Sequence, residues 1–148
     1  SLIRRLVENC PNIVGMKDSS GSLSTLVASA PLRDGDFNTA IGADGLTLAG
    51  VAVGIDAFIS GNANVVPELI VALYEAASSG DLILARELQR QLDTVRQLLG
   101  DGSNYSLFKG ILAQRGIAVG QVRAPLLQSP EAIIQERWRE LSALVLKG

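Results

Sequence analysis

One lysine of this chain has the sequence context that a catalytic amine requires. Lys17 ends the short run Asn12-Ile13-Val14-Gly15-Met16-Lys17 and is followed at once by the turn-forming residues Asp18-Ser19-Ser20-Gly21. At the C-terminal end of a buried strand, packing holds the stem of a lysine and desolvation lowers the pKa of its ammonium. A neutral amine attacks a ketone to form a Schiff base, an electron sink for making or breaking a carbon–carbon bond. The alternative is a solvated lysine that only marks where a strand leaves the core.

The composition excludes several other kinds of site. The 148 residues include no histidine, which removes His-activated nucleophiles and every His-containing zinc or iron site, and we expect no metal ion. The single cysteine, Cys10, excludes an internal disulfide and indicates a reducing compartment. A net charge of −2 with dispersed basic residues argues against nucleic-acid partners. We find no membrane-spanning apolar run and no signal-peptide pattern, so we expect a cytoplasmic protein without a membrane partner.

Short apolar strands alternate with helices in the first half of the chain, which is typical of parallel βα units. We expect strands at residues 13–17, 37–42 and 55–60. We expect helices at residues 2–8, at 22–30 after a Ser22 cap, and at 46–53 after an Asp44 cap. The helix at 46–53 is hydrophobic nearly all round and is expected to be buried. Further helices are expected at 67–77, from Asp81 to about 99, at 104–115 and after 129–130.

Three segments, in order, resemble the dihydrodipicolinate synthase / N-acetylneuraminate lyase family. The Lys17 segment, residues 12–21, is similar to the strand that carries the family's Schiff-base lysine. The second match comprises residues 42–44, 54–60 and 63–67, similar to a G-x-D segment followed by G-x-x-x-x-I-S-x-x-A-N-V. A weaker third match is Lys109, Gly116, Arg123 and Pro125. The resemblance covers nearly the whole chain, but only the C-terminal half of a family member.

The resemblance implies an α/β fold that is part of a TIM (β/α)8 barrel. Residues 1–66 would form its last three βα units, strands six to eight, and residues 67–148 the last barrel helix and an all-helical C-terminal extension. A complete barrel has eight strands and typically about 250 residues, so five strands are missing. The open edges of such a half-sheet invite association. We therefore expect a homo-oligomer, or a partner that supplies the missing N-terminal half.

The resemblance also implies a Schiff-base (class I) aldolase or lyase that needs no cofactor. Its substrates would be a 2-oxo acid, pyruvate, and an aldehyde, joined in a product such as a 2-keto-3-deoxy sugar acid or 4-hydroxy-2-oxoglutarate. Lys17 would condense with the keto group. The substrate-binding positions implied are Ser19, Gly42, Asp44, Ile59 and Gly61. The structural alternatives are helix caps at Ser19 and Asp44, a turn residue at Gly42 and a core residue at Ile59.

Two parts of the family machinery have no match in this sequence. Neither Tyr74 nor Tyr105 lies in the Y-N-x-P context of the family's proton-relaying tyrosine, and the G-x-T-G-E type loop that grips the substrate carboxylate is absent. We therefore predict little or no turnover by this chain alone. Asp18 after the lysine favours the aldolase and lyase members, because synthase members tend to carry glutamate there. The alternatives are dihydrodipicolinate synthase and a non-catalytic half-barrel assembly module.

Overall fold

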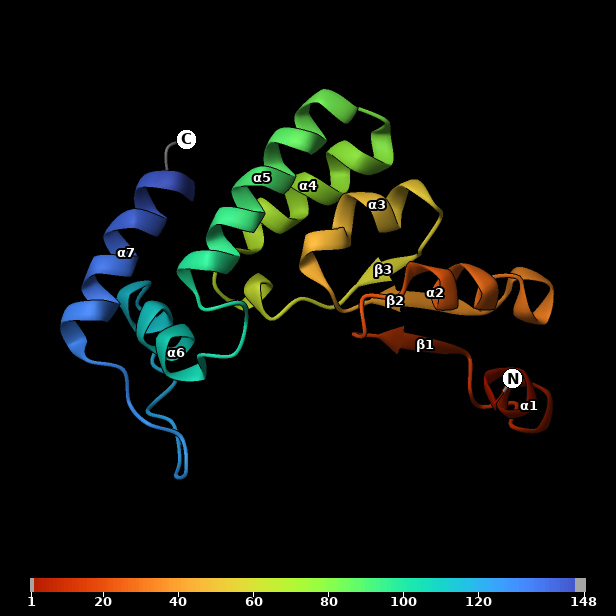
Figure 1. Cartoon of the computed structure of the whole chain (residues 1–148), viewed down its shortest axis with the longest axis horizontal. Helices are drawn as coiled ribbons and strands as arrows, with labels where there is room; N and C mark the ends of the chain where they lie inside the picture. Colours follow the sequence, from red (N-terminus) through yellow and green to blue (C-terminus); the bar gives the residue numbers. More distant parts are fainter. Residues whose placement is uncertain (1, 146–148) are drawn as a thin grey trace. The chain divides into compact units, whose positions relative to one another are not determined.

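The computed structural model describes residues 2–145, except the side chain of Arg33, as an alternating α/β segment followed by helices (Figure 1). Its elements are α1 (Leu2–Asn9), β1 (Gly15–Asp18), α2 (Leu23–Ser29), β2 (Asn38–Ile41), α3 (Thr47–Ala52), β3 (Ala57–Phe58), α4 (Pro67–Ser79), α5 (Leu82–Leu98), α6 (Tyr105–Gln114) and α7 (Glu131–Val145). Single 3-10 turns are η1 (Leu32–Gly35), η2 (Asp44–Leu46) and η3 (Asn62–Asn64). The described residues form two compact units, 2–60 with 73–89, and 61–72 with 90–145.

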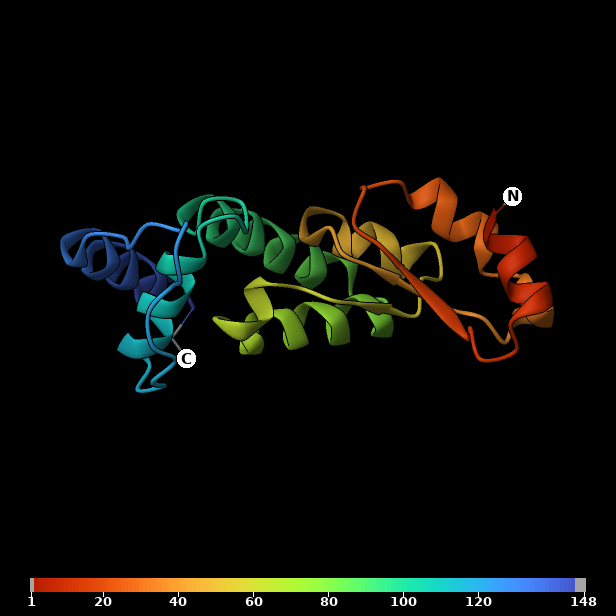
Figure 2. The same cartoon turned by 90° about the horizontal axis from the view of Figure 1, so that it is seen from below.

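The first unit contains a parallel sheet with the order β1-β2-β3, as the βα pattern predicts. Figures 1 and 2 show the three strands side by side. The third strand is shorter than the expected range of 55–60. Its pairing with β2 starts only at Ala57, because the buried Thr39 of β2 gives its N–H to the Asp56 carboxylate at 2.7 Å instead of to a strand carbonyl.

Helices cover one face of this sheet. Side chains alternate between the two faces of a strand, so one set of residues from each strand points toward α2 and α3. Leu26, Ile41 and Ile55 form the buried centre of this core. The partly buried residues packed around it are Met16, Leu23, Ala43, Leu46 and Phe58. Phe58 also packs against Tyr74 of α4 with the two rings tilted by 60° and their centroids 5.7 Å apart.

The opposite face of the sheet is open. It carries the alternate residues of the strands and lines a wide hollow with Gly15, Lys17, Asn38, Ala40, Ala57 and Ile59. No element of the first unit covers it within the described residues, and Ile59 is 53% exposed. Two expectations are therefore wrong for this chain: Ile59 is not a core residue, and Lys17 is exposed rather than held in a buried strand.

Two local expectations also differ from the structure. The helix expected at 46–53 is only half buried, because one side packs on the core while Ala49, Ala52 and Val53 face solvent. Ser22 does occupy the N-cap position of α2, but its hydroxyl pairs with that of Thr25 at 3.0 Å instead of accepting from a helix N–H.

Capping and close helix packing organise the second unit. The Asn104 side chain accepts from Leu107 N–H at 3.0 Å and so starts α6. Gly110 lets α7 approach closely, because a Cβ there would lie 2.5 Å from Ile134 Cδ1. Ile134 and Leu141 are buried on α7, as their helical spacing predicts. Across residues 2–145 the helices are all too short or too polar to cross a bilayer.

Candidate functional site

Three of the predicted site residues meet where β1 and β2 end. The N–H of Gly42 donates to the carbonyl of Asp18 at 2.7 Å, which ties the loop after β2 to the end of β1. A Cβ on Gly42 would lie 2.6 Å from Lys17 Cε and would overlap Ser19 Oγ. The missing side chain at position 42 is therefore what allows the lysine stem and the serine hydroxyl to lie together. Gly42 has a steric role beyond that of a turn residue.

The residue after the lysine shapes the loop. Asp18 Oδ1 accepts the N–H of Ser20 at 2.6 Å, an Asx-type turn that depends on the short aspartate side chain. Hydrogen bonds from the side chain and the backbone N–H of Ser20 hold the pKa of Asp18 below its ordinary value of 3.8. The turn that follows Lys17 thus carries an ionised carboxylate near neutral pH.

Asp44 is buried and is held by other side chains. Its carboxylate Oδ2 accepts the hydroxyl of Ser60 at 2.7 Å, and the residue is 8% exposed. The N-cap interpretation of Asp44 is wrong, because Asp44 lies inside η2 and its carboxylate forms no capping bond to α3. Ser60 is the serine of the I-S pair in the second matched segment. Its hydroxyl therefore orients the Asp44 carboxylate, a role that the sequence alone did not reveal.

Gln89 of α5 fixes the backbone of the same loop. Its Nε2 donates to the carbonyl of Asp44 at 3.1 Å, and its Oε1 accepts the N–H of Leu48 at 3.0 Å. The hydroxyl of Thr47 also donates to the Asp44 carbonyl, at 2.9 Å. Gln89 is distant in sequence and has no motif around it, so only the fold could identify it.

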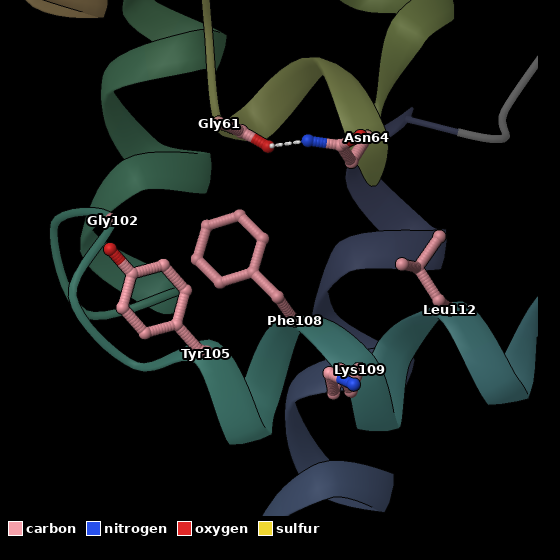
Figure 3. Close-up of a pocket in the computed structure, with 7 residues that line it drawn as sticks. All are labelled: Gly61, Asn64, Gly102, Tyr105, Phe108, Lys109 and Leu112. Atoms are coloured by element: carbon pink, nitrogen blue, oxygen red, sulfur yellow. Dashed lines mark hydrogen bonds between the residues drawn. The ribbon is translucent and has the colours of Figure 1, made fainter. Parts of the chain in front are cut away.

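The last two predicted site residues lie in different places. Ile59 borders the same open hollow as Lys17, and its N–H donates to the carbonyl of Ile41 at 2.9 Å. Gly61 belongs to the second unit and lines a separate cavity there, together with Asn64 (Figure 3). Asn64 Nδ2 donates to Gly61 O at 3.0 Å, which ties the Asn64 side chain to its own loop.

The first unit thus places the stem of a lysine beside a serine hydroxyl at the carboxyl end of a parallel sheet. An amine can attack a carbonyl carbon, and a neighbouring hydroxyl can donate to or accept from an oxygen of the bound molecule. No group of three or more Asp, Glu or Cys residues with the spacing of a metal site occurs among residues 2–145. The arrangement suits carbonyl chemistry on a small molecule.

Parallel βα units with helices on one face place the chain in the α/β class. Within that class, the model of the dihydrodipicolinate synthetase family matches residues 1–144. The chain belongs to this family.

Curated relatives support this assignment. The chain is 37% identical over 142 residues to a 4-hydroxy-tetrahydrodipicolinate synthase of Methanopyrus kandleri, a match that covers 96% of this chain and 47% of the relative. It is 34% identical over 145 residues to the enzyme of the same name from Archaeoglobus fulgidus, covering 98% and 50%. The chain spans about half the length of the curated relatives it matches.

Solved structures share the fold. A putative dihydrodipicolinate synthetase from Pseudomonas aeruginosa aligns with a TM-score of 0.85 at 25% identity, over 97% of this chain and 49% of that protein. An N-acetylneuraminate lyase from Proteus mirabilis aligns with a TM-score of 0.85 at 20% identity, over 96% and 48%. The arrangement of strands and helices is therefore that of half of each of these proteins.

Proposed function

We propose that this chain contributes the Schiff-base half of a pyruvate-dependent aldolase or lyase. The observation that carries the proposal is the packing of Gly42 against the Lys17 stem and the Ser19 hydroxyl. The packing of the Lys17 stem at the carboxyl end of a parallel strand supports the proposal, because catalytic groups lie there in (β/α)8 enzymes. Membership of the dihydrodipicolinate synthetase family supports the same chemistry.

The proposed reaction begins when Lys17 Nζ attacks C2 of pyruvate. Loss of water from the carbinolamine gives the imine, and loss of a proton from C3 gives an enamine. The enamine carbon attacks the aldehyde carbon to form the new carbon–carbon bond, and hydrolysis of the imine releases the product and the free amine. Cleavage is the same sequence reversed. The protonated imine provides the electron sink in both directions.

The other site residues are proposed to hold the substrates. The Ser19 hydroxyl, beside the amine, would bind a substrate oxygen. The Asp44 carboxylate, oriented by Ser60, and the backbone carbonyl of Gly42 would accept hydrogen bonds from substrate hydroxyls. The backbone at Ile59 would lie against the pyruvate carboxylate, and Gly61 would complete the pocket wall. These roles follow the family resemblance, residue by residue.

Two observations favour different second substrates. Asp18 favours an aldehyde that gives a 2-keto-3-deoxy sugar acid or 4-hydroxy-2-oxoglutarate. The curated relatives are named 4-hydroxy-tetrahydrodipicolinate synthase, which favours a second candidate: ring formation from pyruvate and an amino aldehyde. Both candidates share the imine. A complete barrel assayed with each aldehyde separates them by its ratio of kcat/KM values.

The open sheet face supports the proposal that the active form is larger than this chain. Lys17 and Ile59 lie on a face that would become the interior of a (β/α)8 barrel once further strands are present. We propose that these strands come from an N-terminal half, or that copies of the chain associate through this face.

Imine trapping tests the chemistry directly. The chain is incubated with pyruvate, reduced with borohydride, digested and mapped by mass spectrometry. The sequence has three lysines, and Lys109 and Lys147 serve as internal controls. We expect the reduced adduct on Lys17, slowly formed in this chain alone and absent in Lys17→Ala. Equal labelling of the three lysines, or none on Lys17 when the complete barrel is tested, would refute the proposal.

A further inference from the structure

The second unit contains an apolar cavity of about 160 Å³ that shares only Gly61 with the proposed imine site. One wall is α6, whose residues at three- and four-residue spacing share a face. Figure 3 shows the rings of Tyr105 and Phe108 rising from this face, with Leu112 further along the helix. Gly61 and Asn64 of the η3 segment form the opposite wall, and Gly102 closes one side.

The cavity exists because two of its walls lack side chains. A Cβ on Gly61 or on Gly102 would meet no atom within 4 Å. Gly102 has a φ of +81°, which explains glycine at that position. Gly61 has a φ of −66°, which any residue adopts, so its backbone does not require glycine. Position 61 therefore borders the cavity without a side chain, although its backbone accepts any residue type.

Two polar groups lie at the mouth of the cavity. Tyr105 is 58% exposed, and its hydroxyl has no hydrogen-bond partner among residues 2–145. Asn64 uses its Nδ2 on Gly61 O, and its side-chain oxygen accepts no hydrogen bond from the described part of the chain. Lys109 contributes its aliphatic stem, because its Nζ donates to Val119 O at 2.9 Å and to Gln121 O at 3.1 Å.

We propose that this cavity binds a small, neutral ring compound that carries one hydroxyl group, with phenol as the simplest member of the class. An apolar cavity of about 150 Å³ holds a benzene ring. The ring would pack against Phe108 and Leu112, and its hydroxyl would bond with the Tyr105 hydroxyl at the mouth. A carboxylate fits poorly, because the walls are apolar and the Lys109 ammonium is already bound to two carbonyls.

Ligand-observed NMR titration of the 148-residue chain tests this assignment with phenol, toluene and benzoate. We expect saturable binding of phenol and toluene, and benzoate at least about tenfold weaker. Gly61→Leu fills the cavity without backbone strain and should weaken phenol binding at least about tenfold. The matched control is Ala113→Leu, which adds similar bulk to the exposed side of α6 and should leave binding unchanged.

A second variant tests the hydrogen bond at the mouth. Tyr105→Phe should weaken binding of phenol but not of toluene, a difference that a general loss of structure cannot produce. Thermal unfolding confirms that each variant is folded. The proposal is overturned by absence of saturable binding, by unchanged affinity in Gly61→Leu, by tighter binding of benzoate than of phenol, or by equal effects of Tyr105→Phe on the two neutral probes. Lys17 takes no part in this test, so its result is independent of imine trapping.

Discussion

At the scale of single residues, Gly42 has the strictest steric requirement of the candidate site. We predict that Gly42→Ala destabilises the chain by about 1–3 kcal/mol, because the added methyl group must displace Ser19 and the Lys17 stem. The same displacement should lower the yield of trapped imine at Lys17 by roughly tenfold or more, because small misplacements of a reacting group are costly. Urea unfolding and quantitative peptide mapping measure the two effects.

Gly61→Ala is the matched control for this substitution. A Cβ at that position meets no atom within 4 Å, so the free energy of unfolding should stay close to that of the unaltered chain. Equal stability of the two alanine variants would show that the close approach at Gly42 does not constrain the fold.

Asp56 gives a pH-dependent prediction. Hydrogen bonds from the backbone N–H and the hydroxyl of Thr39 hold the pKa of Asp56 below its ordinary value of 3.8. Because the pKa of Asp56 is lower in the folded chain than in the unfolded chain, the ionised carboxylate stabilises the fold at pH values above the unfolded-state pKa. This stabilisation is lost as the pH falls through the folded-state pKa. Asp56→Ala should cost about 1–3 kcal/mol at pH 7, because it leaves the buried N–H of Thr39 without its acceptor.

That cost should shrink when urea unfolding is repeated at progressively lower pH, as the pH falls through the depressed pKa of Asp56 and the carboxyl of the unaltered chain becomes protonated as well. The control is Asp36→Ala, since Asp36 is exposed and forms no hydrogen bond with the described residues. A cost for Asp56→Ala that does not change with pH would assign the effect to packing instead of charge.

The sequence predicted residues with local signals well and residues with distant partners poorly. Lys17 and Gly42 were identified from short motifs at the ends of strands, and the structure brings them together. The exposure of Lys17 was not predicted, because it depends on which elements cover the opposite sheet face. Ser60 and Gln89 were missed for the same reason: their partner, Asp44, lies 16 and 45 residues away in the chain.

At the scale of elements, the order of strands and helices could be predicted from the spacing of apolar residues. The lengths of the strands depended on tertiary contacts. The expected strand at 55–60 shortens to Ala57–Phe58 because the Asp56 side chain replaces one backbone bond of the sheet. In contrast, α5 begins after Asp81, whose Oδ1 accepts the N–H of Leu84 at 3.0 Å, as its capping sequence predicts. The Asp81 cap follows from local sequence, whereas the caps expected at Ser22 and Asp44 do not form because their side chains bond to other partners.

Gln89 connects α5 to the start of α3, and this contact can be tested by a nearly isosteric change. Gln89→Glu keeps an oxygen for the N–H of Leu48 but places a second oxygen against the Asp44 carbonyl. We predict a loss of about 1–3 kcal/mol near neutral pH, since a donor is replaced by an unpaired acceptor. Amide hydrogen exchange should accelerate in residues 44–48.

Gln97→Glu is the control on the same helix, because Gln97 is exposed and should tolerate the change within about 0.5 kcal/mol. Equal exchange rates at residues 44–48 in the Gln89 variant and the unaltered chain would contradict the proposed role of Gln89.

At the scale of the whole molecule, the two faces of the sheet differ in what covers them. One face packs on α2 and α3 around Leu26 and Ile41, whereas the other carries the amine of Lys17 and an isoleucine that is half exposed. Parallel sheets are generally covered on both faces. The open face is therefore the surface that the proposed (β/α)8 barrel would enclose once further strands extend the sheet.

Association through this face gives the last prediction. Light scattering of the unaltered chain should show a weight-average mass above the monomer value of 15.6 kDa that rises with concentration. Ile59→Lys places a charge on the open face and should weaken association by roughly tenfold or more, because burial of an isoleucine contributes about 1.5–3 kcal/mol. Ile117→Lys is the matched control, since Ile117 is 50% exposed, close to the 53% of Ile59, and lies in the second unit. A chain that stays monomeric at all concentrations, or two lysine variants with equal effects, would exclude the open face as the association surface.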